Sequence, residues 1–112
     1  MKCFASELNL KDDPDLIEKY KEHHRNVWPE VLEGIKDSGI TRMKIFLKGR
    51  HMFMYCETRD DFSPGNSPKD PIQVRKNDEW QELMHKFQEQ LPGSSPGEWW
   101  GPMEEVFDLE TA

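Results

Sequence analysis

The sequence predicts an α+β protein of order βαββαβ, the split-βαβ or ferredoxin-like arrangement, in a single domain that spans residues 1–112. Three observations lead to this prediction. Four short segments alternate apolar and polar residues as strands do: 2–9, 40–48, 51–57 and 103–109. Two longer segments, 14–38 and 72–90, repeat their apolar residues with the period of a helix. Clusters of Gly, Pro, Asp and Ser separate these segments and predict turns and loops.

The first half of the chain carries clear boundary signals. Asp12-Asp13-Pro14 supplies an acidic N-cap region with a proline in the first helical turn. Pro29 lies inside the predicted helix and lacks the amide that would bond to the carbonyl of Arg25, so we expect a kink or a restart there. Gly39 ends this helix. The short turn at residues 48–50 joins the next two strands as a hairpin.

The second half contains two proline-rich loops around a second helix. Residues 60–71 include three prolines and a glycine, which predict a surface loop. His85 projects away from the apolar arc of helix 72–90, and we give it no role. Loop 91–97 then leads through Glu98 into the closing strand. The apolar arc of this helix consists of Trp80, Leu83, Met84, Phe87 and Leu91.

The predicted topology leaves one face of the sheet uncovered. Right-handed crossovers would place both helices on the same face of an antiparallel sheet. A second copy of the chain is the simplest cover for the other face. Hydrophobic residues make up 35% of the chain and charged residues 33%, which is lean for one small domain and favours an oligomer. We therefore expect a homodimer.

Charge and cysteine content exclude several kinds of partner. The net charge of −7 argues against binding to nucleic acid or to an anionic membrane, and no apolar run is long enough to span a bilayer. Residues 1–7 meet a charge too early for a signal peptide, so we expect a cytoplasmic location. Cys3 and Cys56 should lie on neighbouring strands as reduced core thiols. The two cysteines and four histidines show no zinc-site spacing, and we expect no metal and no cofactor.

His24 interrupts the apolar face of the first helix. On a helical wheel it falls among the apolar residues, next to Tyr20 one turn earlier. Burial of an imidazole costs desolvation free energy unless its ring nitrogens find partners or a ligand. His24 is therefore either a hydrogen-bonded core histidine or a histidine that faces a ligand pocket. His23, at the edge of the arc, is expected at the surface. The apolar arc consists of Leu16, Ile17, Tyr20, Val27, Trp28, Val31 and Ile35.

The segment Tyr20-x-x-x-His24-x-Asn26-x-Trp28-Pro29-Glu30 resembles the L-rhamnose mutarotase family of small sugar epimerases. The resemblance extends from the opening strand to the Glu105-Val106-Phe107-x-Leu109 segment and is weaker between residues 60 and 78. It implies a homodimeric α/β barrel. It also implies an isomerase that exchanges the α and β anomers of a monosaccharide.

The resemblance assigns roles to the residues of this segment. His24 matches the catalytic acid/base of the family, and Tyr20 matches its sugar-contacting tyrosine. Mutarotation needs one proton delivered to the ring oxygen and another removed from the anomeric hydroxyl, and a histidine with a pKa of about 6.5 can do both without a cofactor. Trp28 offers a flat apolar face either for the sugar or for core packing.

Two departures from the rhamnose branch of the family leave the sugar open. Met43 stands where that branch carries a tyrosine, and Leu83 and Met84 stand where it carries a pair of tryptophans. Residues 91–104 look more like the branch associated with L-fucose. We therefore expect a 6-deoxy-L-hexose, either L-rhamnose or L-fucose.

The aromatic residues of this chain lie elsewhere. Trp80 belongs to the second helix, and the Trp99-Trp100 pair lies in the loop before the last strand. One of this pair could supply the sugar-stacking surface that the second helix supplies in the rhamnose branch. The competing interpretation is that the pair only plugs the end of the barrel or the dimer contact.

Three other functions fit the same scaffold. A haem-degrading or quinone-type monooxygenase would also place His and Trp near a barrel pocket, and absorbance with added haem would reveal it. A non-enzymatic dimeric α/β-barrel protein that binds a small ligand would have no need of the titratable pair Tyr20 and His24 in its apolar face. A structural or regulatory dimer would pack both residues with no adjacent cavity.

Overall fold

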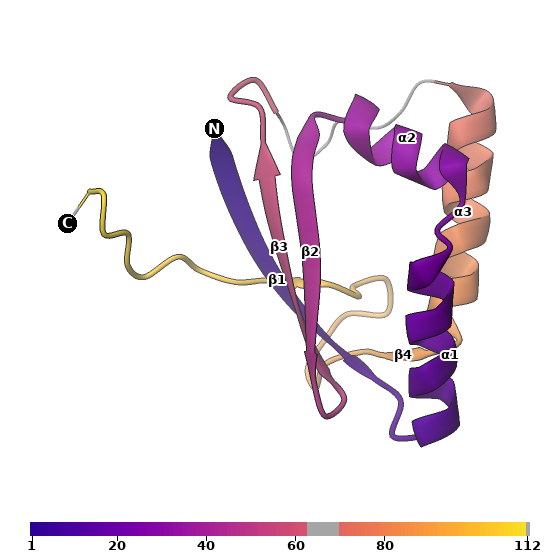
Figure 1. Cartoon of the computed structure of the whole chain (residues 1–112). Coiled ribbons are helices and arrows are strands. Elements are labelled where there is room, and N and C mark those ends of the chain that lie inside the picture. Colours follow the sequence, from indigo (N-terminus) through magenta and orange to yellow (C-terminus); the bar gives the residue numbers. More distant parts are fainter. Residues whose placement is uncertain (63–69, 112) are drawn as a thin grey trace.

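A computed structural model of the chain describes residues 1–62 and 70–111, so most of the proline-rich loop predicted at 60–71 lies outside the described residues. The elements follow the order βααββαββ (Figure 1). The helices are α1 (Pro14–Arg25), α2 (Pro29–Asp37) and α3 (Pro71–His85). The strands are β1 (Lys2–Leu10), β2 (Ile40–Lys48), β3 (His51–Thr58), β4 (Gln88–Glu89) and β5 (Gly101–Pro102).

The strands form one antiparallel sheet with the order β2-β3-β1-β4, and β5 also pairs with β1. Leu8 of β1 lies opposite Met52 of β3, which in turn lies opposite Leu47 of β2, so one face of the sheet is continuously apolar at this level. This is the ferredoxin-like strand order, and the predicted fold class is confirmed.

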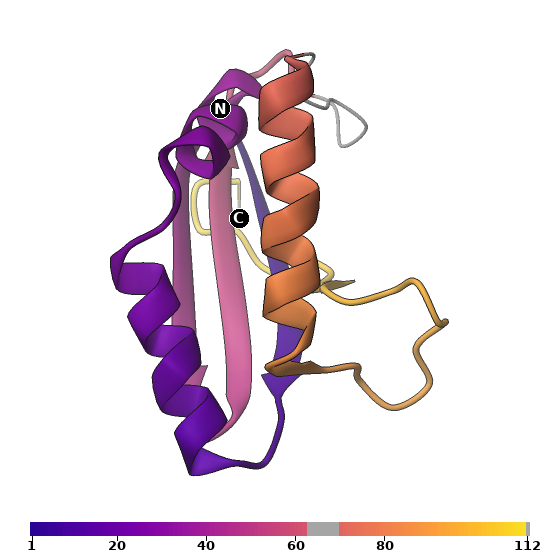
Figure 2. The same cartoon turned by 90° about the vertical axis from the view of Figure 1, so that its right-hand side faces the viewer.

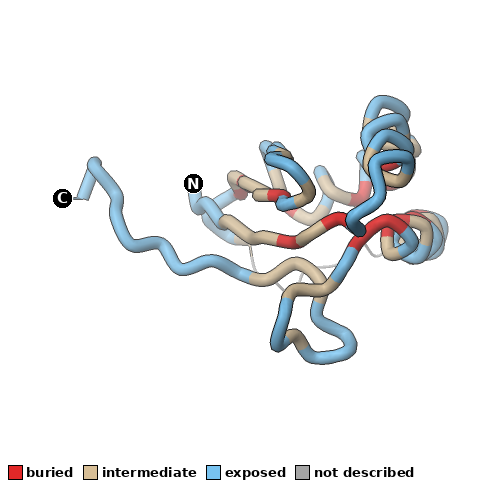
Figure 3. The backbone as a smooth tube through the Cα atoms, turned by 90° about the horizontal axis from the view of Figure 1, so that it is seen from below, coloured by how far each residue is buried: buried red, intermediate tan, exposed pale blue. Residues whose placement is uncertain are grey.

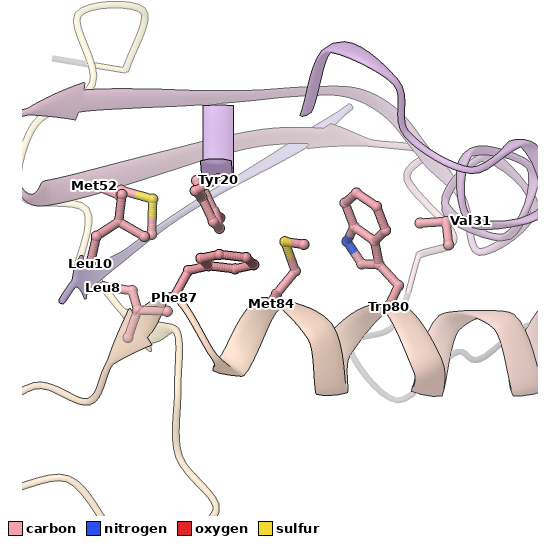
Figure 4. Close-up of a cluster of buried hydrophobic side chains, with 8 residues drawn as sticks. All are labelled: Leu8, Leu10, Tyr20, Val31, Met52, Trp80, Met84 and Phe87. Atoms are coloured by element: carbon pink, nitrogen blue, oxygen red, sulfur yellow. The ribbon is translucent and has the colours of Figure 1, made fainter. Parts of the chain in front are cut away.

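All three helices cover the same face of the sheet. Figure 2 looks onto this layer, with α1 and α2 on one side, α3 on the other and the strands behind them. In Figure 4, three side chains project from α3 and the turn that follows it, toward α1 and the sheet. The buried cluster between helices and sheet consists of Leu8, Leu10, Tyr20, Val31, Met52, Trp80, Met84 and Phe87.

Local signals set the helix ends. The side chain of Asp13 accepts hydrogen bonds from the amides of Asp15 and Leu16 and caps α1. The expected interruption at Pro29 is a full break, because α1 ends at Arg25 and α2 restarts with Pro29 as its first residue. Gly39 follows α2 with φ of 105°, a left-handed conformation that favours glycine.

The second long helix is shorter than predicted. We expected it to reach residue 90, but α3 ends at His85, and Gln88 and Glu89 form β4 opposite Leu10 and Asn9. The amide of Lys11 also donates to the carbonyl of Phe87 at 2.8 Å. Backbone pairing with the edge of β1 therefore prevails over the helical periodicity of the sequence.

The predicted closing strand at 103–109 is wrong. β5 is confined to Gly101 and Pro102, and after the amide of Met103 donates to the carbonyl of Ala5 the chain leaves β1. β1 continues back to Lys2, so its edge does not end there, and the chain diverges from β1 without pairing with residues 2–4. Alternation in the sequence is therefore not sufficient to form a strand. We refer to residues 103–111 as the C-terminal arm. Figure 3 shows the arm extending away from the body and exposed along its length.

The sheet face opposite the helices is open in the single chain. Phe46 of β2 is 54% exposed there and contacts Phe53 of β3, with 6.2 Å between ring centroids. Of the two cysteines, Cys56 is buried, whereas Cys3 is exposed instead of lying in the core as predicted. Within the described residues, no helix is both long and apolar enough to cross a bilayer.

Candidate active site

A cavity of about 620 Å³ lies between the helices and the sheet, within the range typical of small-molecule sites. Its lining residues come from all three helices, from β2, β3 and β4, and from the loop that carries Trp100. Most of the wall is apolar and comes from α2, β2 and β3. The aromatic residues of the wall and its histidine are Tyr20, His24, Trp80 and Trp100. Its other polar or charged residues are Lys21, Lys36, Thr41, Arg42, Asn77, Gln81 and Gln88.

His24 lies in the cavity wall at the end of α1. Its Nδ1 is 2.9 Å from the main-chain carbonyl oxygen of Tyr20, so the neutral ring carries its proton on Nδ1 and leaves Nε2 as the basic nitrogen. Burial lowers the pKa of His24 from its ordinary value; the Tyr20 carbonyl raises it, and neighbouring His23 lowers it further. The net direction makes His24 a neutral base at neutral pH.

Tyr20 lies one helical turn before His24, with 4.3 Å between the two ring centroids. It is only 5% exposed, and desolvation raises the pKa of its hydroxyl, although a hydrogen bond from Gln88 acts in the opposite direction. Tyr20 therefore remains protonated at neutral pH. A helix places residues four apart on one face, which is why the sequence could predict this pair.

Trp80 and Trp100 line the cavity, whereas Trp28 and Trp99 do not. Trp80 is buried, and its ring meets that of His24 edge-on at 5.6 Å. Trp28 is partly buried and packs edge-on against Trp80, with 5.2 Å between ring centroids, and it does not line the cavity.

Trp99 stacks on His85, the histidine to which we gave no role. Their rings are nearly parallel, at 7°, with centroids 3.8 Å apart. A second interaction holds the same loop, because Nε2 of Gln90 lies within hydrogen-bonding distance of the carbonyls of Ser95, Pro96 and Glu98. These contacts fix the loop that delivers Trp100 to the cavity.

His23 differs from its predicted surface position. It is half-buried, and its ring contacts Phe87 at 5.4 Å and Trp80 edge-on at 6.4 Å. His23 does not line the cavity and packs against the back of the core instead.

Two of the three positions at which we expected a departure from the rhamnose branch line the cavity. Met43 of β2 and Met84 of α3 both line it, whereas Leu83 does not. Flexible thioether side chains thus occupy both of these wall positions.

Gln88 is a wall residue that we did not predict from the sequence, and it lies next to Tyr20. It is 3% exposed, and its amide nitrogen lies 3.4 Å from the hydroxyl oxygen of Tyr20. A signal was present, because Gln88 is four residues after Met84 and so shares the predicted apolar arc. The same signal, a polar residue on an apolar arc, had drawn attention to His24.

On a ferredoxin-like scaffold, a histidine and a tyrosine lie side by side in the wall of a largely apolar cavity, and these are the kinds of group that acid–base chemistry on a small organic substrate requires. The comparison with known proteins gives the family. The chain belongs to the L-rhamnose mutarotase family, whose model matches residues 2–109.

Two curated relatives match nearly the whole chain. It is 47% identical to a UPF0734 protein of Dictyostelium discoideum over 97% of this chain and 90% of that protein. It is 36% identical to the L-fucose mutarotase of Xanthomonas campestris pv. campestris over 98% of this chain and 88% of that protein. Mutarotases are isomerases, and the chain is accordingly an isomerase of this family.

A solved structure shares the fold. The crystal structure of L-rhamnose mutarotase from Formosa agariphila superposes with a TM-score of 0.69 at 24% sequence identity, over 97% of this chain and 99% of that one. The scaffold that carries His24 and Tyr20 is therefore the family's scaffold.

Proposed function

We propose that the protein is a mutarotase that interconverts the α and β anomers of a 6-deoxy-L-hexose, with L-fucose as the first candidate and L-rhamnose as the second. The placement of His24 and Tyr20 side by side in the wall of one cavity carries this proposal. The preference for L-fucose is supported by the similarity to an L-fucose mutarotase over almost the full length and by the methionines at positions 43 and 84.

The proposed reaction assigns one proton transfer to each residue. His24 Nε2 takes the proton of the anomeric hydroxyl while the Tyr20 hydroxyl gives its proton to the ring oxygen, and the bond between the anomeric carbon and the ring oxygen breaks. The open-chain aldehyde turns its other face to the attacking hydroxyl. Ring closure returns both protons, so the enzyme ends as it began.

Saturation-exchange NMR of the anomeric protons of L-fucose and L-rhamnose tests the function directly. We expect added protein to accelerate exchange of at least one sugar above its spontaneous rate. Binding of a sugar with no acceleration would favour the alternative of a small-ligand-binding protein. A haem absorbance band that appears on titration would favour the monooxygenase alternative.

The pH dependence of exchange follows from the two shifted pKa values. Because burial lowers the pKa of His24, kcat/KM is expected to stay level through neutral pH and to fall only at a midpoint below about 6.5, as the imidazole becomes protonated. Because the pKa of Tyr20 is raised, kcat/KM is expected to fall at alkaline pH only above about pH 10. Exchange rates measured between about pH 4.5 and 9, corrected for the spontaneous reaction, check this profile. An acidic midpoint above 6.5 would contradict it.

The two loop tryptophans should differ in their effect on sugar binding. Trp100→Ala removes an aromatic wall of the cavity and is expected to weaken sugar binding by about 1–3 kcal/mol. Trp99→Ala is expected to have a smaller effect, because Gln90 still holds the loop. Titration of each variant by NMR provides the comparison. If both variants bind normally, the aromatic wall must be sought at Trp80.

Assembly and location complete the proposal. We propose a homodimer in which the open sheet face and the C-terminal arm are covered by a second copy; support comes from the exposure of Phe46 and of Val106 and Phe107 in the arm. We also propose a cytoplasmic location, supported by membership of a family of sugar-metabolising enzymes.

A further inference from the structure

Gln88 carries a buried polar atom that has no partner. Its side chain enters the cavity wall from β4, and its Nε2 lies 3.4 Å from the Tyr20 hydroxyl oxygen. Its Oε1 is inaccessible to solvent and makes no hydrogen bond to any described residue. Buried amide oxygens almost always have a donor, and an unsatisfied one is destabilising. A methionine or leucine here would avoid that cost, so the chain retains a group that suits a ligand better than it suits the fold.

The same side chain controls the direction of the Tyr20 proton. Since the amide of Gln88 donates to the Tyr20 oxygen, the phenolic proton of Tyr20 is left for another acceptor. If the amide is turned over, its oxygen accepts that proton and its nitrogen becomes the unpartnered group. In both orientations, one polar atom of Gln88 remains unpaired beside Tyr20. The first orientation is the one in which Tyr20 can donate to a ring oxygen.

We propose that Gln88 is a substrate-binding residue: a small movement of its side chain on sugar binding uncovers Oε1, which accepts a hydrogen bond from a sugar hydroxyl, while its Nε2 holds Tyr20 as the donor to the sugar. This inference rests on the proposed mutarotase function. It adds a polar anchor on β4, opposite the catalytic helix. It also explains why a glutamine occupies a position that the surrounding core would fill with an apolar side chain.

The chain offers a matched control in Gln73. This glutamine is also nearly buried, at 9% exposed, but its Nε2 donates to Asp37 at 3.1 Å and it does not line the cavity. Gln73→Met therefore removes a satisfied structural hydrogen bond. Gln88→Met removes the amide whose Oε1 has no hydrogen-bond partner.

The experiment compares melting temperature, KM and kcat for the wild-type chain and these two variants, with L-fucose and L-rhamnose as probes. Gln88→Met is expected to melt at or above the wild-type temperature and to raise KM by roughly 10-fold or more. Gln73→Met is expected to melt lower and to keep the wild-type KM. A large fall in melting temperature for Gln88→Met with unchanged KM would show a structural role and overturn the inference.

Gln88→Glu tests the second half of the proposal with a side chain of the same shape. The new carboxylate still accepts from a sugar hydroxyl, but it also accepts the Tyr20 proton that the mechanism needs. We expect kcat at neutral pH to fall by roughly 10-fold or more, with a smaller change in KM. Unchanged kcat at neutral pH would overturn the role in orienting Tyr20. If the wild-type chain neither binds nor exchanges either sugar, both the proposed function and this inference are wrong. If the wild-type chain is active and the Gln88 variants behave as it does, only this inference is wrong.

Discussion

His24→Ala is expected to lower the rate of anomer exchange by roughly 10²-fold or more, while the variant folds as the wild type does. The loss is large because His24 supplies the only neutral imidazole in the described wall of the cavity. The fold should survive, since the ring of His24 bonds only to the carbonyl of its own helix and is half-exposed. Saturation-exchange NMR at fixed sugar and protein concentration measures the effect.

His51→Ala is the matched control for this variant. His51 is an exposed histidine of β3 that bonds to Asn9 and lies outside the cavity. We expect it to exchange the sugar at the wild-type rate. If a correctly folded His24→Ala variant exchanges the anomers at the wild-type rate, His24 is not the catalytic base. Tyr20 would then be the next residue to test.

The second large effect concerns assembly. Light scattering of the wild-type chain at micromolar concentration is expected to give twice the 13.3 kDa of one chain. Phe46→Lys is expected to produce monomers, because it places a charge on the open sheet face. A chain that ends at Pro102 should also lose the dimer, because it lacks the apolar residues of the C-terminal arm, namely Met103, Val106, Phe107 and Leu109.

Ile72→Lys separates this effect from a general loss of hydrophobic surface. Ile72 is 55% exposed, as Phe46 is 54% exposed, but it lies on α3 on the helical side of the molecule. It should leave the dimer intact. A wild-type chain that stays monomeric at micromolar concentration would refute the proposed assembly.

Local signals made most of the fold predictable. The cap at Asp13, the restart at Pro29 and the left-handed Gly39 each depend on a few neighbouring residues, and the structure contains all three. The juxtaposition of Tyr20 and His24 belongs to the same category, because spacing of four on a helix fixes it. These features can be predicted from the sequence because their partners are close in the sequence.

The errors share the opposite cause. The helical pattern continued past His85, yet the free edge of β1, about 80 residues earlier, takes Gln88 and Glu89 into the sheet. The closing strand failed because alternation shows a tendency to pair and not the presence of a partner. In the site, Gln88 meets Tyr20 across the whole fold, and no local rule connects two residues so far apart.

The central position of β1 has a consequence for the synthesis of the protein. β1 leaves the ribosome before its partners β3, β4 and β5, and the last of them ends at Pro102. Its hydrogen bonds on one edge therefore cannot form until nearly the whole chain has been translated. Contacts this distant in sequence slow folding and leave a strand edge exposed meanwhile. In a truncated nascent chain, β1 should thus pair with β3 on one edge only. Protection from hydrogen exchange of the β1 amides on the other edge would show when β4 and β5 have paired with it.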